Sequence, residues 1–179
     1  MKKILLVTLD FYPKIGGVAN YYFNLCKSLP RENIMVLTDG RMEEESELGF
    51  KIFWKELLKP NVWPHFWPMF GSIKVIAKQE KIEMLWIGDL WPTGLVAWLV
   101  RRPYILSVHG RDLLLAREVW WKKTLVKIIL RKAVTVTANS QSTAAIVGSF
   151  GVAKERIKVV YPGVNQEIKK SRNQGKVNR

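Results

Sequence analysis

Two short stretches of the sequence carry residue types that can bind or transform a ligand. The first holds the adjacent glycines Gly16 and Gly17, between an apolar run and a segment with helical periodicity. The start of a helix presents unpaired N–H groups and the positive end of the helix dipole, and a glycine there lets a phosphate approach the backbone. The pair is therefore a candidate phosphate-binding loop. A Gly-Gly turn also serves simply to permit positive φ, and that alternative stays open.

Two well-known nucleotide motifs are missing around these glycines. The sequence contains neither the G-x-G-x-x-G fingerprint nor a G-x-x-x-x-G-K-[ST] loop. Their absence argues against a dinucleotide site and against a P-loop nucleotide site.

The second stretch is "HGRD", from His109 to Asp112, directly after an apolar run that is typical of a strand. A lone histidine at the end of a strand is commonly a structural hydrogen-bonding residue. The adjacent glycine and the carboxylate of Asp112 favour a functional role for His109 instead. The other histidine, His65, has no such neighbours, and we expect it to be incidental. We expect no metal site.

The elements that must position these residues alternate along the chain. Apolar runs rich in β-formers predict strands, and segments with a 3.6-residue period predict helices between most of them. Uninterrupted apolar strands that alternate with helices are typical of a parallel sheet with helices on both faces. We therefore predict an α/β fold, a Rossmann-like, doubly wound and mainly parallel sheet. The predicted strands cover residues 4–8, 33–37, 51–54, 84–87, 104–108, 134–137 and 158–161, and the predicted helices cover residues 17–29, 71–81, 93–99, 118–132 and 140–150.

In such a sheet, ligands bind at the carboxyl ends of the strands, near the point where the strand order reverses. Polar residues and glycines follow several of the predicted strands, and we expect them to lie along this edge. One of them, Ser140, is better explained as a helix N-cap than as a ligand contact. The residues at the edge are Asp10, Gly16, Gly17, Gly88, Asp89, His109, Asp112, Asn139 and Ser140.

Length and composition bound the domain organisation. The chain has 179 residues, 48% of them apolar, which suffices for one domain with a real core. We predict that domain over residues 1–165, followed by a basic polar tail or the start of an interdomain linker over residues 166–179. The single cysteine, Cys26, excludes a disulfide framework, and its place in the helical period predicts a core residue.

Charge and hydropathy bear on partners and location. The formal net charge of +14 favours anionic partners such as phosphates or acidic lipids, although we do not expect nucleic acid as a partner. The first apolar run is too short for a signal peptide, and the longest one is interrupted by Asp89, Pro92 and Gly94. We expect no transmembrane segment, and a cytoplasmic protein that can associate peripherally with the inner face of a membrane.

Three segments, taken together, resemble one known family. They are "DFYPKIGGVANYYFNLCKSL", "SVHGRDLL" and "TANSQSTAAIVGSFGVAKERIKVVYPGV". Their order and separation are similar to those in the amino-terminal domain of family 4 retaining glycosyltransferases of the GT-B type (glycosyl transferases group 1). The resemblance covers about residues 3–165. The turn "YPGV" lacks an asparagine that the family has there, so no role of that asparagine carries over.

The resemblance implies two Rossmann-like domains that face each other across a cleft. The carboxyl-terminal domain mainly holds the nucleotide-diphosphate sugar, through basic residues and a spaced pair of glutamates that this chain lacks. On this half, the resemblance places Gly16 and Gly17 against the donor diphosphate, and His109 and Asp112 near the sugar and the reacting centre. It implies no cofactor, because the nucleotide-diphosphate sugar is the donor substrate. N–H groups at a helix start would stabilise the charge that builds up on the leaving diphosphate.

Two further groups of residues bear on the acceptor and on membranes. Trp63 and Trp67 lie with two phenylalanines among prolines, and they either fill the core beneath a loop or form an apolar wall for an acceptor. We favour the wall, because proline-rich loops seldom bury every ring. Further along, Lys123, Lys127 and Arg131 recur at every fourth position of a predicted helix. This stripe is either a solvated face or, with the paired tryptophans beside it, a surface that docks on an anionic membrane.

The sequence thus predicts the amino-terminal, acceptor-side domain of a retaining glycosyltransferase of the hexosyltransferase type. We expect it to act on a saccharide or lipid-linked acceptor and to be inactive without a carboxyl-terminal domain. The alternative is a non-catalytic module of the same fold that binds a membrane surface or a partner. A receiver-like phosphorelay domain fits less well, because His109 stands where such a domain needs a lysine.

Overall fold

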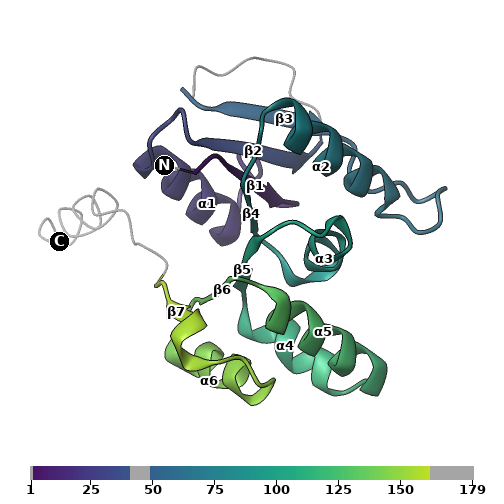
Figure 1. Ribbon diagram of the computed structural model, residues 1–179, viewed down its shortest axis with the longest axis vertical. Coiled ribbons are helices and arrows are strands. Elements are labelled where there is room, and N and C mark those ends of the chain that lie inside the picture. Colours follow the sequence, from purple (N-terminus) through teal and green to yellow (C-terminus); the bar gives the residue numbers. More distant parts are fainter. Residues whose placement is uncertain (1, 41–48, 162–179) are drawn as a thin grey trace, which may run out of the picture.

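The structure is a computed structural model that describes residues 2–40 and 49–161. Within these residues, seven strands form one parallel sheet in the order β3-β2-β1-β4-β5-β6-β7 (Figure 1). This confirms the predicted α/β fold with a doubly wound parallel sheet. The predicted boundary near residue 165 lies outside the described residues. The strands are β1 (Ile4–Thr8), β2 (Ile34–Asp39), β3 (Lys51–Lys55), β4 (Met84–Ile87), β5 (Tyr104–Val108), β6 (Thr135–Ala138) and β7 (Ile157–Val159).

The central strand β1 shows why the strands are continuous apolar runs. Ile4 pairs in register with Ile34 of β2 on one side and with Met84 of β4 on the other. Both faces of β1 are covered as well, because Leu5 is buried in one cluster and its neighbour Leu6 is buried in the other. A strand enclosed on all sides cannot alternate between apolar and polar residues, as an exposed sheet would require.

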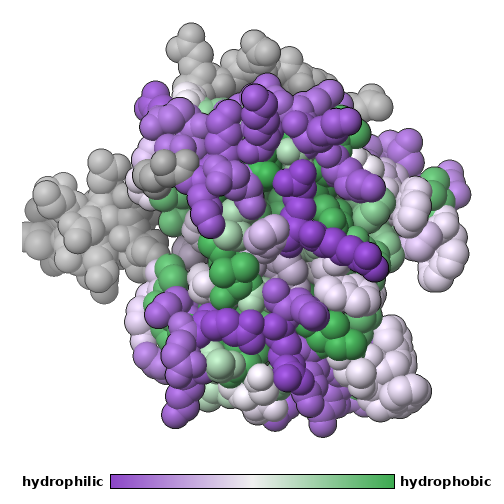
Figure 2. All heavy atoms as spheres, viewed as in Figure 1, coloured by the Kyte–Doolittle hydropathy of each residue, from purple (hydrophilic) through white to green (hydrophobic). Residues whose placement is uncertain are grey.

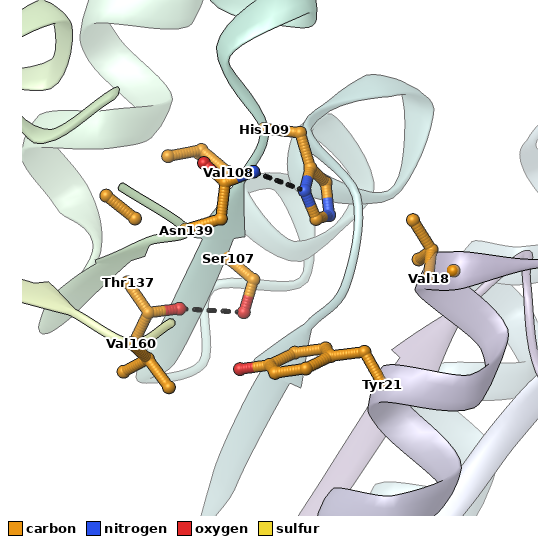
Figure 3. A pocket seen from close by; sticks show the side chains of 10 residues that line it. Val18, Tyr21, Ser107, Val108, His109, Thr137, Asn139 and Val160 are labelled. Carbon is orange, nitrogen blue, oxygen red and sulfur yellow. Dashed lines mark hydrogen bonds between the residues drawn. The ribbon is translucent and has the colours of Figure 1, made fainter. Parts of the chain in front are cut away.

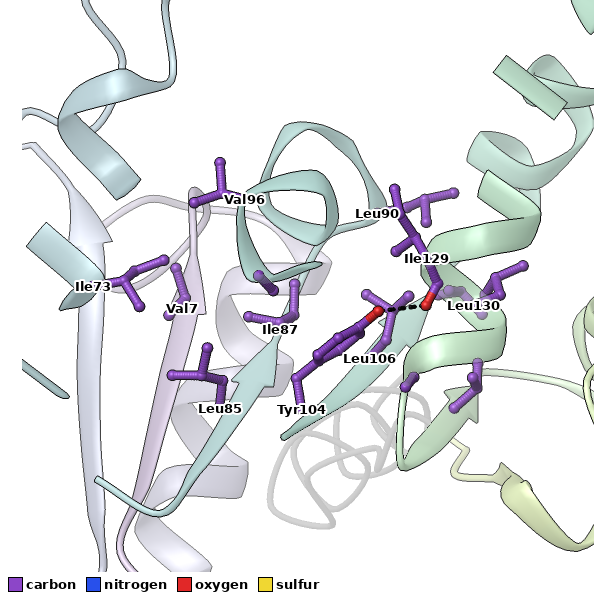
Figure 4. Packing of buried hydrophobic residues seen from close by; sticks show 14 of the residues in the cluster. Val7, Ile73, Leu85, Ile87, Leu90, Val96, Tyr104, Leu106, Ile129 and Leu130 are labelled. Carbon is purple, nitrogen blue, oxygen red and sulfur yellow. Dashed lines mark hydrogen bonds between the residues drawn. The ribbon is translucent and has the colours of Figure 1, made fainter. Parts of the chain in front are cut away.

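Helices cover both faces of the sheet. In Figure 1, α1 lies on one side of the sheet, whereas α2, α3 and α5 lie on the other. Two buried clusters correspond to these faces: the smaller includes Tyr22 and Cys26 of α1, and the larger includes Ile73 of α2, Val96 of α3 and Ile129 of α5 (Figure 4). The helical segments are α1 (Gly17–Ser28), α2 (Trp67–Gln79), the irregular turn η1 (Leu90–Gly94), α3 (Leu95–Val100), α4 (Gly110–Arg117), α5 (Trp120–Lys132), α6 (Gln141–Ser149) and the short turn η2 (Lys154–Arg156).

Two helices differ from the prediction. The helix expected from residue 71 begins at Trp67, because Pro68 occupies its first turn, where a proline is favourable and does not end the helix. In addition, α4 forms directly after His109, in a stretch for which no helix was predicted. This helix is short, and it packs through Leu113 and Ala116, one turn apart on the same face.

The predicted core position of Cys26 is confirmed. Its side chain is 1% exposed, and burial raises the pKa of the thiol to about 12. A thiol that stays protonated at neutral pH is a poor nucleophile, so Cys26 is a packing residue.

No helix within residues 2–40 and 49–161 has the length and apolar character needed to cross a membrane.

Candidate functional site

The strand order reverses between β1 and β4, and the carboxyl ends of these strands therefore flank the switch point of the sheet. Asp89 lies at this point. Its Oδ2 atom accepts hydrogen bonds from the Leu9 N–H, at 3.0 Å, and from the Thr8 hydroxyl, at 3.2 Å. Burial raises the pKa of Asp89, and these two hydrogen bonds act in the opposite direction. The carboxyl group thus joins the ends of β1 and β4.

Gly88, next to Asp89, is a glycine that the packing requires. A Cβ atom there would lie 2.8 Å from Cβ of Thr8 and 3.0 Å from Cε2 of Tyr22. Both neighbours are completely buried and cannot move aside. The Tyr22 hydroxyl also donates a hydrogen bond of 2.7 Å to the Gly88 carbonyl, which ties α1 to the end of β4. The small size of Gly88 therefore lets α1 pack against the end of β4 through Tyr22.

Gly16 and Gly17 differ from Gly88, because nothing in the fold requires them to lack a side chain. Gly16 precedes α1 with a φ of 174°, extended backbone that any residue adopts. A Cβ atom on either glycine would meet no atom within 4 Å. No side chain caps the helix, and the first backbone bond of the helix runs from the Asn20 N–H to the Gly16 carbonyl. The start of α1 therefore offers open N–H groups at the positive end of the helix dipole, as a phosphate site requires.

A cavity of about 230 Å³ opens beside the first turn of α1 (Figure 3). It brings together two of the predicted site residues, Gly17 and His109, which are far apart in the sequence. Hydroxyl groups form part of its lining: Ser107 and Thr137 lie 2.8 Å apart, and Ser107 also accepts a hydrogen bond of 2.9 Å from the Trp86 indole. Val18 and Tyr21 of α1 face these residues across the cavity in Figure 3.

His109 reaches this cavity from the position just before α4. Its Nδ1 lies 3.5 Å from the amide nitrogen of Asn139, and the amide oxygen of Asn139 accepts a hydrogen bond of 2.8 Å from the Thr143 hydroxyl. Because Thr143 occupies the oxygen end of the amide, its NH₂ end faces the imidazole. In this arrangement Nδ1 is the acceptor and Nε2 is the ring nitrogen left to donate. Within the described residues Nε2 has no hydrogen-bond partner, so its N–H is a donor that the fold does not use.

The structure separates Asp112 from the cavity that contains His109. Asp112 lies in the first turn of α4, where a carboxylate interacts favourably with the helix dipole. It lines a neighbouring cavity of about 260 Å³ together with Trp91, Leu115 and Lys122. The sequence analysis grouped Asp112 with His109 because both lie in the HGRD stretch directly after a predicted strand. The helix turns the carboxylate towards a different cavity, and its role in the reaction stays a prediction.

Trp63 and Trp67 are not core residues beneath a loop. Their side chains are 86% and 55% exposed, respectively. Trp63 lines a third cavity, whereas Trp67 stacks on Phe70 with ring centroids 5.2 Å apart and does not line that cavity. Exposure excludes the core interpretation for both tryptophans, and only Trp63 has a cavity in which an acceptor could lie.

The predicted basic stripe lies on an exposed part of α5. Lys123, Lys127 and Arg131 are all exposed, while Val126 and Ile129 pack against the core. Beside the stripe, Trp120 is 80% exposed and Trp121 is 44% exposed. The helix therefore presents cations and aromatic rings together.

Ser140 caps α6 by accepting a hydrogen bond from the Thr143 N–H, which confirms its structural role.

The arrangement of the sheet and its edge defines a class of protein. The structure of HepE from Anabaena, in complex with UDP and glucose, superposes with a TM-score of 0.65 at 19% identity, over 97% of this chain and 50% of that chain. The fold is the α/β architecture of one half of a GT-B glycosyltransferase. Residues 15–168 match the family model for Glycosyltransferase Family 4, and the chain belongs to that family.

Two curated relatives have similar sequences. One is the GDP-mannose-dependent monoacylated alpha-(1-6)-phosphatidylinositol monomannoside mannosyltransferase of Corynebacterium glutamicum, which is 26% identical over 62% of this chain and 31% of its own length. The other is the uncharacterized glycosyltransferase MJ1178 of Methanocaldococcus jannaschii, 26% identical over 93% of this chain and 48% of its own length. The chain thus spans less than half of the length of these two curated relatives.

Proposed function

We propose that this chain is the acceptor-side half of a retaining glycosyltransferase of the hexosyltransferase type. The observation that carries the proposal is the cavity that joins the open start of α1 at Gly17 to His109. The names of similar proteins support a nucleotide-sugar donor, since HepE is in complex with UDP and glucose and the Corynebacterium glutamicum relative is dependent on GDP-mannose. The acceptor is a saccharide or a lipid-linked molecule.

In this proposal the start of α1 stabilises the leaving group. Negative charge grows on the nucleoside diphosphate as its bond to the sugar breaks. The N–H groups of Gly17, Val18 and Ala19 point from the positive end of the helix dipole and are fixed before the reaction begins. The missing side chains at Gly16 and Gly17 allow the phosphate oxygens to come within hydrogen-bonding distance of the backbone.

His109 then positions the sugar that is transferred. Asn139 holds the imidazole so that Nε2–H is the free donor, and a sugar hydroxyl can accept from it. Asp112, from the adjacent cavity, contacts the acceptor. In a retaining transfer the new bond forms on the face of the sugar that the diphosphate leaves. The proposal requires no cofactor besides the donor substrate and no metal.

The division between two domains can be tested by calorimetry. Because a second domain would hold most of the donor, this chain alone should bind UDP or GDP with a Kd of about 1 mM or weaker, where binding is worth about 4 kcal/mol. A form extended by a family 4 carboxyl-terminal domain should bind more tightly and release the nucleoside diphosphate when it is given a nucleotide sugar and an acceptor. Micromolar binding by the chain alone would contradict this division.

The stereochemistry is a separate test of the function. The two-domain form is supplied with a set of UDP- and GDP-sugars, and the anomeric configuration of the product is read by NMR. Retention of the donor's configuration is expected. An inverted product would overturn the retaining mechanism, and no product with any donor would favour a non-catalytic module.

A second function is favoured by the surface of α5. We propose that Lys123, Lys127 and Arg131 dock the protein on an anionic membrane, as a peripheral protein of the inner, cytoplasmic face. Exposed tryptophans such as Trp120 suit the boundary between lipid headgroups and hydrocarbon. A non-catalytic membrane-surface module would use the same helix, so vesicle binding without transfer would favour that alternative.

A further inference from the structure

Among the described residues, a third cavity of about 510 Å³ forms an aromatic groove at one end of the molecule. Three separate segments build it: the stretch before α2, the turn η1 and the first turn of α5. In Figure 2, much of the right-hand edge, over the start of α2 and the α4–α5 pair, is pale or green, whereas the neighbouring surface is mostly purple. The groove is lined mainly by Trp63, Pro64, Phe66, Trp91, Pro92 and Trp121.

The chemistry of this groove suits hydrocarbon. Apart from the indole N–H groups, His65 is the polar side chain in the lining, and its Nδ1 lies 3.1 Å from the Lys59 carbonyl. A saccharide buried here would find few partners for its hydroxyls, and burying hydroxyls without hydrogen bonds is unfavourable. Trp63, Trp91 and Trp121 nevertheless keep 86%, 47% and 44% of their surface exposed. An apolar chain laid along these rings would remove that surface from water.

The aromatic groove continues towards the site already described. Trp91 lines both this groove and the cavity that contains Asp112 and Lys122. Asp112 in turn belongs to the first turn of α4, which begins directly after His109. The aromatic groove therefore adjoins the cavity of Asp112 and Lys122, and that cavity is bordered by the helix that follows His109 in the chain.

Lys122 is the cation at the border between the groove and this cavity. Its Nζ lies 5.5 Å from the centre of the Trp121 ring, at the junction between the groove and the next cavity. Within the described part of the chain neither Lys122 nor Asp112 forms an ion pair. The cavity beyond the groove is lined mainly by apolar residues, and Asp112 and Lys122 are its charged side chains. An ammonium group at this border is placed to bind an anionic group that ends a hydrocarbon chain.

We infer that the acceptor is an amphiphile in which a hydrocarbon chain is joined through a phosphate to the group that receives the sugar. This inference rests on the proposed function, and it decides between the two acceptor classes left open there. The chain lies in the aromatic groove, the phosphate lies against Lys122, and the receiving hydroxyl points past Asp112 towards His109. The aromatic groove binds a single hydrocarbon chain along its length. Docking on a bilayer would instead use all of the exposed aromatic rings.

Binding of alkyl phosphates tests this without a nucleotide sugar. Octyl and decyl phosphate, below their critical micelle concentrations, are titrated calorimetrically into the chain, with inorganic phosphate as the reference. Two further methylenes in the groove should tighten binding by about fifteenfold, which corresponds to about 0.8 kcal/mol for each buried methylene. Equal binding of octyl phosphate, decyl phosphate and inorganic phosphate would overturn the inference.

The chain offers matched control variants. Trp63 and Trp120 are both exposed, at 86% and 80%, but only Trp63 lines the groove. Trp63→Ser should weaken the binding of decyl phosphate by about tenfold, as truncation of an aromatic anchor commonly does. Trp120→Ser should leave this binding unchanged. Equal losses in the two variants would indicate unspecific adsorption to aromatic surface and would refute the groove. Unchanged far-UV circular dichroism shows that both variants fold.

The position of the phosphate has its own pair of variants. Lys122→Gln should weaken the binding of decyl phosphate by up to about fivefold but leave the binding of the uncharged octyl glucoside unchanged. Lys123→Gln, at the next position of α5, should affect neither ligand, because Lys123 lines no cavity that contains Trp91. Equal effects of both lysines would overturn the phosphate site. If alkyl phosphates bind but no sugar is transferred, the proposed function is refuted and the alkyl phosphate site stands. If sugar is transferred to a saccharide without a hydrocarbon chain and alkyl phosphates do not bind, only the amphiphilic acceptor is refuted.

Discussion

Alanine substitutions at Gly17 and Gly88 distinguish a glycine that serves ligand binding from a glycine that the packing requires. A Cβ atom at Gly17 meets nothing within 4 Å, and the backbone there is the first turn of α1. Alanine loses less conformational freedom on folding, so Gly17→Ala should raise the free energy of unfolding by about 0.4 to 1 kcal/mol. Gly88→Ala should lower it by about 1 to 3 kcal/mol, because its Cβ would lie within 3.0 Å of buried atoms.

The two effects have opposite signs and can be measured by thermal unfolding. For a chain of this size, about 1 kcal/mol shifts Tm by about 2 to 4 °C. Gly71→Ala is a matched control, since Gly71 lies inside α2 and its Cβ would also meet nothing within 4 Å. Gly71→Ala and Gly17→Ala should therefore both raise Tm slightly.

Sugar transfer should distinguish Gly17→Ala from that control. In the two-domain form, a methyl group at the start of α1 would push the diphosphate out of place by about 1 Å, which can lower the rate by about a hundredfold. Transfer is followed as release of the nucleoside diphosphate. Gly71→Ala should leave it unchanged. A Gly17→Ala enzyme as fast as the Gly71→Ala enzyme would refute the assignment of the Gly16-Gly17 loop to the diphosphate.

Two further predictions concern surface charge and buried charge. Replacing Lys123, Lys127 and Arg131 together by glutamine should weaken binding to anionic vesicles by about a hundredfold, at about 1 kcal/mol per residue. Binding to neutral vesicles should not change. If the variant and the unaltered chain sediment equally with anionic vesicles, only the interpretation as a solvated face remains. Burial raises the pKa of Asp89 in the folded chain. Its carboxyl therefore contributes to stability at pH values below the pKa of about 4 that it has in the unfolded chain, and this contribution is lost as the pH rises through the pKa of the folded chain. Between about pH 3 and pH 7 the unaltered chain should therefore lose stability relative to Asp89→Asn in urea denaturation, and parallel stability curves would contradict the raised pKa.

The sheet could be predicted because its strands are enclosed on both faces. Continuous apolar runs such as that of β1 leave little choice of element, and the alternation with helices then implies a parallel order. Gly17 and His109 were placed at the same edge for this reason, and the structure brings them to one cavity. The order of strands themselves, and hence the switch point at Asp89, depends on pairings between distant segments that no local pattern contains.

Short helices and side-chain exposure were harder to predict. The stretch after His109 begins with a glycine and polar residues, so α4 was missed, although Leu113 and Ala116 have the spacing of one helical face. Because this helix was not predicted, the sequence could not show that Asp112 lines a different cavity from His109. Trp121 lies beside apolar residues on the helical wheel, but its exposure depends on how η1 and the stretch before α2 leave the groove open.

Sugar transfer by the His109→Ala variant tests the central claim most directly. His109 faces the cavity at the start of α1 with a donor that the fold does not use, and its removal leaves the Asn139–Thr143 hydrogen bond in place. In the two-domain form we expect transfer to fall by about a hundredfold to a thousandfold, the usual effect of losing one preorganised polar contact, while Tm changes little. A near-native transfer rate in His109→Ala would show that this edge of the sheet is ordinary turn structure and not the site of the reaction.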